Sequence, residues 1–248
     1  MSSDVEPTRQ QQVDKQLLGA VAAGHRKTGV AHGRAGLAWT FAWFMALLVV
    51  TDSLGGESRR DLARDDGRSR GSPRAPVTLI EYSDFTCGFC VRFFRETWPR
   101  IRAHYVDSGK VRFVYRDYPR ASEGPGLEAA LAARCAGDQG RYWQMHDRLF
   151  GSDGRRDTPE FEQHATALGL DHDVFAACLR DAPYIREIFL DRKEGYDLGF
   201  RGTPGFALVK TDGSREESPI LLPGALPYEE FQDQIERLLK RVKGGGEG

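Results

Sequence analysis

The sequence predicts an α/β domain built around a pair of cysteines, and three observations lead to this fold class. Residues 77–82, Val-Thr-Leu-Ile-Glu-Tyr, have the composition of a buried strand. A turn of residues 83–86 follows, and Cys87-Gly88-Phe89-Cys90 then begins an apolar helical segment. Further along the chain, a long block with helical spacing separates two more stretches with strand composition. Strands and helices therefore alternate around the cysteines.

The order strand, turn, CxxC, helix is typical of the active site of a thioredoxin-like fold. Cysteines three residues apart at a helix start lie within disulfide reach, and the helix N-terminus favours a thiolate on the first. We therefore predict that Cys87 is the nucleophile, with a pKa lowered to roughly 3.5–7.5. Cys90, one turn later, is then the more buried resolving cysteine. The motif predicts a thiol–disulfide oxidoreductase whose redox-active disulfide needs no cofactor.

Two other interpretations of the CxxC pair are a structural disulfide and half of a metal site. A zinc site needs four ligands, and the sequence contains no second CxxC and no closely spaced Cys/His pair. Four cysteines in 248 residues instead suit one active pair and one structural bridge. We expect no metal.

Composition restricts the partners. The chain is 40% hydrophobic and 29% charged, an ordinary globular mixture for one large or two small domains. With 35 basic and 36 acidic residues its formal net charge is −1, which argues against a nucleic-acid partner.

Three segments precede the predicted domain. Residues 1–34 are polar and predict a disordered tail. Residues 35–51 carry no charge, and about 17 such residues predict a transmembrane anchor or uncleaved signal in contact with the lipid bilayer. A cleaved signal peptide and a buried core helix are the alternatives. Residues 52–75 mix both charges with Gly and Pro, which predicts a flexible linker.

The rest of the chain, residues 76–243, predicts one folded domain. Its first helix continues to Tyr105, with an expected kink at Pro99. A strand over 111–115 follows, then a helical insertion at about 121–200, a hairpin and an amphipathic last helix from Pro227. The helices of the insertion are expected at 127–135, 141–150, 159–168, 171–179 and 182–198, and the hairpin strands at 206–210 and 219–222.

Five motifs in this domain resemble, in order, those of the DsbA-like thioredoxin-fold family of bacteria. The resemblance covers about 170 residues from Val77 onward. It implies a thioredoxin fold with an inserted helical domain, and thiol–disulfide exchange outside the cytoplasm. The motifs are Phe85–Cys90, Val114–Pro119, Tyr142–Phe150, Gly202–Phe206 and Gly224–Phe231.

The resemblance also implies roles for single residues. From the residues alone, the segment around Thr203-Pro204 is a turn, whereas the resemblance implies a cis-proline that faces the CxxC motif. The Thr203 backbone would then pair with an extended substrate. Gly88 and Phe89 are expected to contact substrate too, at the place where the best-known oxidases carry Pro-His, a dipeptide that tunes the redox potential.

Glu81 is six residues before Cys87, where the family places an acid beneath the active site. The resemblance implies that it accepts or relays the proton of Cys90, and burial should raise its pKa. A solvated carboxylate on an edge strand is the alternative. We expect Asp84 to modulate the active-site loop, and His146 to be a packed or capping residue.

Cys135 and Cys178 each lie on a predicted helix of the insertion. A disulfide between them would close a loop of about 44 residues, which the chain-entropy estimate values at about 4 kcal/mol. We expect this structural disulfide, with two free buried thiols as the alternative.

The leading functional expectation is a membrane-anchored oxidase in the bacterial cell envelope, with its catalytic domain in the periplasm. It would donate the Cys87–Cys90 disulfide to reduced or misoxidised secreted proteins and be reoxidised by a membrane redox partner. The alternatives are a disulfide reductase or isomerase, and a non-catalytic peptide- or metal-binding module. The presence of only three methionines argues against copper handling.

Overall fold

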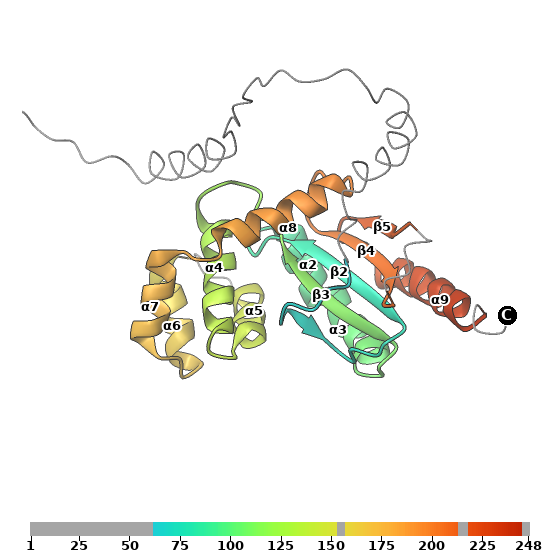
Figure 1. Ribbon diagram of the computed structural model, residues 1–248, viewed down its shortest axis with the longest axis horizontal. Coiled ribbons are helices and arrows are strands. Elements are labelled where there is room, and N and C mark those ends of the chain that lie inside the picture. The colour runs from blue at the N-terminus through green and yellow to red at the C-terminus, as the bar shows by residue number, and fades with distance from the viewer. Residues whose placement is uncertain (1–61, 153–156, 213–217, 245–248) are drawn as a thin grey trace, which may run out of the picture. The chain divides into compact units, whose positions relative to one another are not determined.

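The computed structural model describes residues 62–152, 157–212 and 218–244. In this part of the chain, five strands form one sheet in the order β1-β3-β2-β4-β5 (Figure 1). The central strands β2 and β3 run parallel, and every other neighbouring pair is antiparallel. The strands are β1 (Ser69–Arg70), β2 (Val77–Ser83), β3 (Val111–Asp117), β4 (Gly205–Lys210) and β5 (Ile220–Pro223).

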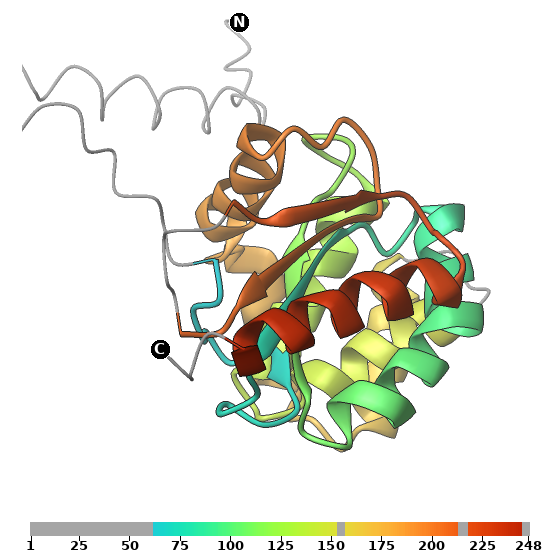
Figure 2. The ribbon, with the colours of Figure 1, turned by 90° about the vertical axis from the view of Figure 1, so that its right-hand side faces the viewer.

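The predicted helical insertion is present between β3 and β4. Figure 1 shows α4 to α7 grouped beside the sheet, with α8 returning along the sheet toward β4. The helices of the insertion are α4 (Pro125–Gly137), α5 (Tyr142–Gly151), α6 (Thr158–Ala167), α7 (His172–Asp181) and α8 (Ile185–Asp197). The last helix, α9 (Tyr228–Gly244), crosses in front of the sheet in Figure 2.

The helix that follows the cysteines contains two π-helical turns. It consists of α2 (Gly88–Arg92), η1 (Phe93–Thr97), α3 (Trp98–Ile101) and η2 (Arg102–Val106). Pro99 lies between the π-helical turns. Because proline has no N–H to donate to the preceding turn, wider turns next to it keep the segment helical. The helix therefore continues through Pro99 to Val106, and the expected kink at this proline remains a prediction.

The two faces of the sheet are covered by different helices. On one face of the sheet, the β2 side chains Val77 and Leu79 belong to the larger apolar core, which also contains residues of α3 and α9. Ile80 and Tyr82 point to the opposite face, where α8 packs. β2 is buried at every position because helices cover both faces.

The expected linker at 52–75 is wrong for the part that the structure describes. Residues 69–70 form β1, which pairs with β3, while Ala63, Arg68 and Ala75 are buried. The mixed charges suggested a solvated tether, yet they pair with charges far along the chain. Residues 52–61 lie outside the described residues, as do the predicted tail 1–34 and anchor 35–51. Within the described ranges, no helix has the length and apolar character needed to cross a membrane.

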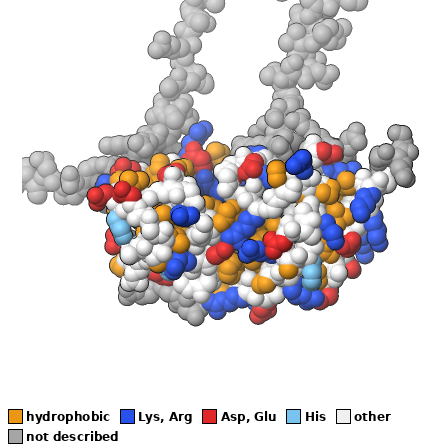
Figure 3. Space-filling view, turned by 90° about the horizontal axis from the view of Figure 1, so that it is seen from below, with side chains coloured by type: hydrophobic (Ala, Val, Ile, Leu, Met, Phe, Trp, Pro, Cys, Tyr) orange, Lys and Arg blue, Asp and Glu red, His pale blue; other side chains and the backbone are white. Residues whose placement is uncertain are grey.

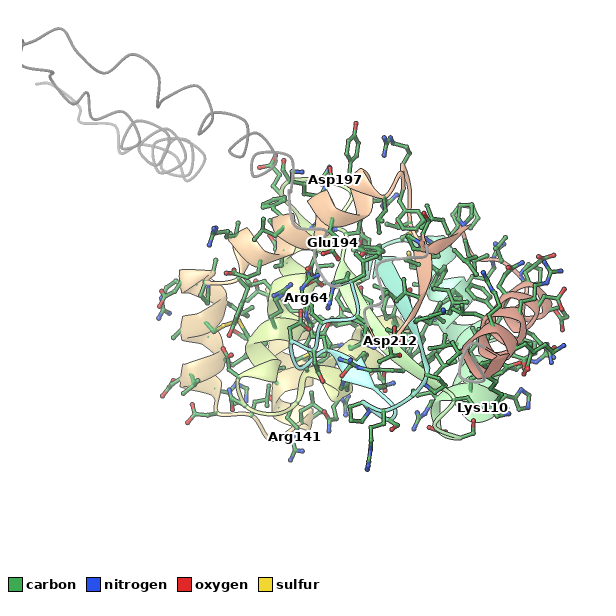
Figure 4. All side chains as sticks on the ribbon, turned by 45° about the vertical axis from the view of Figure 1, so that its right-hand side comes forward. Arg64, Lys110, Arg141, Glu194, Asp197 and Asp212 are labelled. Atoms are coloured by element: carbon green, nitrogen blue, oxygen red, sulfur yellow. A yellow bond between two sulfur atoms is a disulfide. The ribbon has the colours of Figure 1, made fainter. Side chains whose placement is uncertain are left out.

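A buried ion cluster holds this N-terminal segment to the domain. Arg68 Nη1 donates to Asp117 Oδ2 at 3.0 Å and to Asp191 Oδ2 at 2.6 Å. Arg134 of α4 donates to the same two carboxylates at 2.7 and 2.8 Å. Figure 4 shows Arg64 close to Glu194 of α8, with which it forms an ion pair. The cluster therefore joins residues 62–70, β3, α4 and α8.

The expected disulfide between Cys135 and Cys178 is present and joins α4 to α7. Two free buried thiols, the alternative, are excluded for this pair.

On the face drawn in Figure 3, basic and acidic side chains are interspersed, with hydrophobic ones exposed between them.

Candidate active site

Cys87 lies where two strand ends meet. β2 ends at Ser83 and β4 begins at Gly205, and these antiparallel neighbours bring Tyr82 opposite Gly205. The loop before β4 therefore lies beside the turn that follows β2. The Cys87 Sγ atom is 3.3 Å from the carbonyl oxygen of Thr203, and the Thr203–Pro204 peptide bond is cis.

Local hydrogen bonds place Cys87 at the start of the helix. Its backbone N–H donates to the Asp84 carbonyl at 3.0 Å, closing the turn, and its own carbonyl accepts from Val91 at 3.0 Å. Cys87 has extended dihedral angles and is the N-cap of α2. Its sulfur therefore faces backbone N–H groups that no helical carbonyl accepts.

The two cysteines have opposite pKa shifts. A hydrogen bond from the Cys90 thiol, together with the nearby Thr203 side chain and the backbone N–H groups of Cys90 and Phe89, lowers the pKa of Cys87 to about 5 against the effect of burial. Burial, the hydrogen bond to Cys87 and the charges of Cys87 and Glu81 raise the pKa of Cys90 well above its usual value. Cys87 is thus a thiolate at neutral pH while Cys90 keeps its proton.

Glu81 is buried beneath the cysteines. Its neighbours across the sheet are Tyr115 on β3 and Phe206 on β4, so the alternative of a solvated edge carboxylate is wrong. Burial raises the pKa of Glu81 to about 8; the Cys87 charge adds to this, and a hydrogen bond from Ser83 opposes it. Its expected proton-handling role remains a prediction.

The dipeptide between the cysteines is open to solvent. Phe89 is 60% exposed, and the guanidinium of Arg92 lies 5.1 Å from its ring centroid. Gly88 is exposed as well, and a Cβ there would meet no atom within 4 Å. Both residues are free to contact another chain next to the reactive sulfur. Their expected role in substrate binding remains a prediction.

One contribution to the site was not predicted from the sequence, and one expectation is confirmed. The hydroxyl oxygen of Thr203 is buried with no hydrogen-bond partner among the described residues, and the sequence predicts a role only for the Thr203 backbone. His146 was expected to be packed, and it lies within a cage of aromatic rings, which lowers its pKa to about 4 through burial. The cage is made of Phe85, Phe94, Tyr115, Tyr142, Trp143 and Phe150.

Fold and site together define a thiol–disulfide oxidoreductase of thioredoxin type. Comparison with protein families agrees, because the family model described as Thioredoxin matches residues 64–236. The chain belongs to this thioredoxin family, and its structural neighbours place it among the DsbA-like members. The match begins at residue 64, within the segment that had been expected to be a linker.

Solved structures of thioredoxin-like proteins resemble the domain over nearly their whole length. Wolbachia pipientis alpha-DsbA1 is 26% identical with a TM-score of 0.65, covering 73% of this chain and 94% of that one. A thioredoxin-like oxidoreductase from Silicibacter pomeroyi is 29% identical with a TM-score of 0.61, covering 73% and 96%. BdbD from Bacillus subtilis, 22% identical with a TM-score of 0.60 over 70% and 92%, shares the fold.

The curated relatives are much longer proteins. Na(+)/H(+) antiporter NhaA 1 of Salinispora arenicola is 37% identical over 144 residues, which is 57% of this chain and 21% of the antiporter. Na(+)/H(+) antiporter NhaA 1 of Mycolicibacterium gilvum is 28% identical over 223 residues, 86% of this chain and 33% of the antiporter. The chain therefore spans between a fifth and a third of the length of these relatives.

Proposed function

We propose that the domain is an extracytoplasmic oxidase that donates the Cys87–Cys90 disulfide to reduced secreted proteins. The observation that carries the proposal is the opposite pKa shift of the two cysteines. A stabilised Cys87 thiolate favours the reduced form of the pair, so the disulfide is correspondingly easy to reduce. A low-pKa sulfur is also a good leaving group.

The exchange proceeds in two steps. A substrate thiolate attacks the Cys87 sulfur, forming a mixed disulfide, and the Cys87–Cys90 bond breaks with its electron pair on Cys90, which takes up a proton. The second thiolate of the substrate then attacks the substrate sulfur that is bonded to Cys87. This step forms the substrate disulfide and expels Cys87 as a thiolate. Two electrons pass from substrate to enzyme, and the substrate leaves as a disulfide.

Glu81 is the proton donor that we propose for Cys90. Its pKa of about 8 means that most of the carboxyl groups carry a proton at pH 7. A charge on Glu81 raises the pKa of Cys90, so the state in which both groups are ionised is disfavoured and the pair keeps a proton. The carboxyl group can therefore supply the proton as Cys90 is released and recover it later from solvent.

The substrate, a reduced or misoxidised secreted protein, would bind as an extended segment along the Thr203–Pro204 loop. The Thr203 carbonyl is 3.3 Å from Cys87 Sγ, so a segment that pairs with this backbone brings its cysteine to the reactive sulfur. The exposed ring of Phe89 offers an apolar contact on the other side. We assign Gly88 to the same contact because it leaves the approach open.

We propose that the catalytic domain works at a membrane surface outside the cytoplasm. Residues 35–51 lack charge and have about the length of a short membrane span. The curated relatives that contain a similar domain are named as antiporters, which act in membranes. A membrane redox partner would accept the two electrons and restore the disulfide.

Oxidative refolding of a reduced secreted protein tests this function. The oxidised full chain should restore disulfides stoichiometrically, and the Cys87→Ala variant should restore none. Arg74→Ala, an exposed substitution outside the site, is the control and should keep the activity. Catalysed reduction of insulin without substrate oxidation would instead identify a reductase. Binding of peptides with neither activity would identify a non-catalytic module.

A further inference from the structure

The side chain of Asp84 connects the turn before Cys87 to the insertion. Its Oδ1 atom accepts hydrogen bonds from the backbone N–H of Thr86 at 2.7 Å and from the Thr86 hydroxyl at 2.6 Å. Its Oδ2 atom accepts from the backbone N–H of Arg120 at 2.9 Å and from Arg120 Nε at 3.4 Å. One buried carboxylate thus binds two segments 36 positions apart.

The first turn of α4 closes against the same carboxylate. A Cβ atom on Gly126 would lie 2.9 Å from Asp84 Oδ1 and 3.0 Å from Oδ2. Gly126 does not have a positive φ, so the glycine is needed for space and not for its conformation. The absence of a side chain at residue 126 lets the start of α4 approach the Asp84 carboxylate.

We propose that Asp84 is a positioning residue that connects the inserted helices to the turn before Cys87. The position of α4 relative to this turn then sets the reactivity of Cys87. The proposal rests on Cys87 being the reactive thiol. It goes beyond the exchange reaction itself because it makes the insertion part of the reactive site.

A chain of contacts connects α4 to Cys87. The α4 helix is fixed at its other end by the Cys135–Cys178 disulfide and by Arg134 in the buried ion cluster. At its beginning, α4 packs against the Asp84 carboxylate at Gly126, and that carboxylate accepts hydrogen bonds from Thr86 and from Arg120 just before the helix. The Cys87 N–H in turn donates to the Asp84 carbonyl. The Cys87 sulfur is stabilised by groups on both α2 and the Thr203 loop, and hydrogen bonds weaken steeply as their geometry changes. A small shift of the turn therefore changes the stability of the thiolate.

Gly126→Ala tests the proposal without changing any charge. The added Cβ must displace the Asp84 carboxylate, and we expect the Cys87 thiolate to be destabilised. A rise of one unit in its pKa would lower the thiolate fraction, and with it the alkylation rate, about fivefold at a pH near 5. Gly151→Ala is the matched control, because a Cβ at this end of α5 meets nothing within 4 Å and should leave the titration unchanged.

A double-mutant cycle shows whether the effect passes through Asp84. Asp84→Ala removes every Asp84 atom that a Cβ at residue 126 would meet. In this background Gly126→Ala should have no further effect on the Cys87 titration, whereas equal effects in both backgrounds would overturn the proposal. A folded Gly126→Ala protein with the wild-type titration would overturn it as well.

Thr86→Val covers the case in which Gly126→Ala does not fold. It removes the hydroxyl that Asp84 holds and leaves all charges in place, and it should slow alkylation in the same direction. An unchanged rate in that variant would contradict the proposal. These outcomes are separate from the proposed function, because that function fails when wild-type Cys87 itself shows no low-pKa thiolate.

Discussion

The Cys87 sulfur and the Thr203 carbonyl oxygen lie 3.3 Å apart although 116 positions separate the two residues in the chain. Antiparallel pairing of β2 with β4 brings them together, since the end of one strand lies beside the start of the other. The reactive sulfur is thereby placed against a backbone with which an extended peptide can pair. The fold positions the chemistry and the substrate contact at one point.

The low pKa of Cys87 predicts a pH-dependent stability gap between the reduced and oxidised proteins. The pKa is 9.0 for the ordinary thiol and about 5 in the fold, so the stabilisation is complete above pH 9 and lost as pH falls through 5. In urea unfolding, the free energy of unfolding of the reduced form should fall relative to that of the oxidised form as the pH is lowered from 9 to 5, by up to about 1.4 kcal/mol per pH unit. Glu81 is present in both forms, so most of its contribution cancels. A gap independent of pH would contradict a thiolate at Cys87.

Thr203→Val should raise the pKa of Cys87, because it removes a hydroxyl that stabilises the thiolate. Titration of the thiolate absorbance of the reduced protein measures this. Thr211→Val, just beyond the other end of β4, removes a hydroxyl that contacts Thr78 at 2.8 Å and should leave the Cys87 titration as it is. If both variants titrate like wild type, the hydroxyl of Thr203 plays no part at the sulfur.

Glu81→Gln should slow the release of Cys90 by about 10²- to 10⁴-fold at neutral pH, since it removes the group that handles the proton. Its effect on stability has a defined sign. The pKa of Glu81 is raised from 4.5 to about 8, so wild type loses stability as pH rises through 8 and the variant does not. Stopped-flow exchange with a dithiol and unfolding at several pH values check both effects. Glu128→Gln, an exposed substitution at the start of α4, should change neither.

Arg68→Ala should destabilise the domain by about 3–5 kcal/mol, because it leaves buried carboxylates of Asp117 and Asp191 without one of their partners. Chemical denaturation gives the change in the free energy of unfolding. Arg74→Ala, an exposed arginine in the same segment, should stay within about 0.5 kcal/mol of wild type. If both variants change the free energy of unfolding by a similarly small amount, residues 62–75 contribute little to the stability of the fold.

Local patterns in the sequence were sufficient for the fold and for the centre of the site. A buried strand, a turn and CxxC at a helix start place Cys87 and Cys90 without information from elsewhere in the chain. The cis-proline opposite them and the acid at Glu81 required the resemblance to a family, because a Thr-Pro pair alone indicates only a turn.

Contacts between distant charges could not be predicted in the same way. The arginines of residues 62–70 looked solvated because their partners, Asp117 and Asp191, are on β3 and α8. One signal was present: Arg116 lies in a strand of buried residues, and Arg134 in an alanine-rich helix, where an unpaired charge is unfavourable. The link from Asp84 to Gly126 gave no signal, since it depends on how closely a helix end approaches a turn.

The equilibrium of the Cys87–Cys90 pair with glutathione tests the central claim most directly. The full chain is incubated at a series of ratios of reduced to oxidised glutathione, and the free thiols of the protein are trapped and counted. An oxidase with a stabilised Cys87 thiolate should give a reduction potential of about −120 mV, and Thr203→Val should make it more negative. A potential of about −270 mV, the range of reducing thioredoxins, would contradict the claim that this domain donates its disulfide.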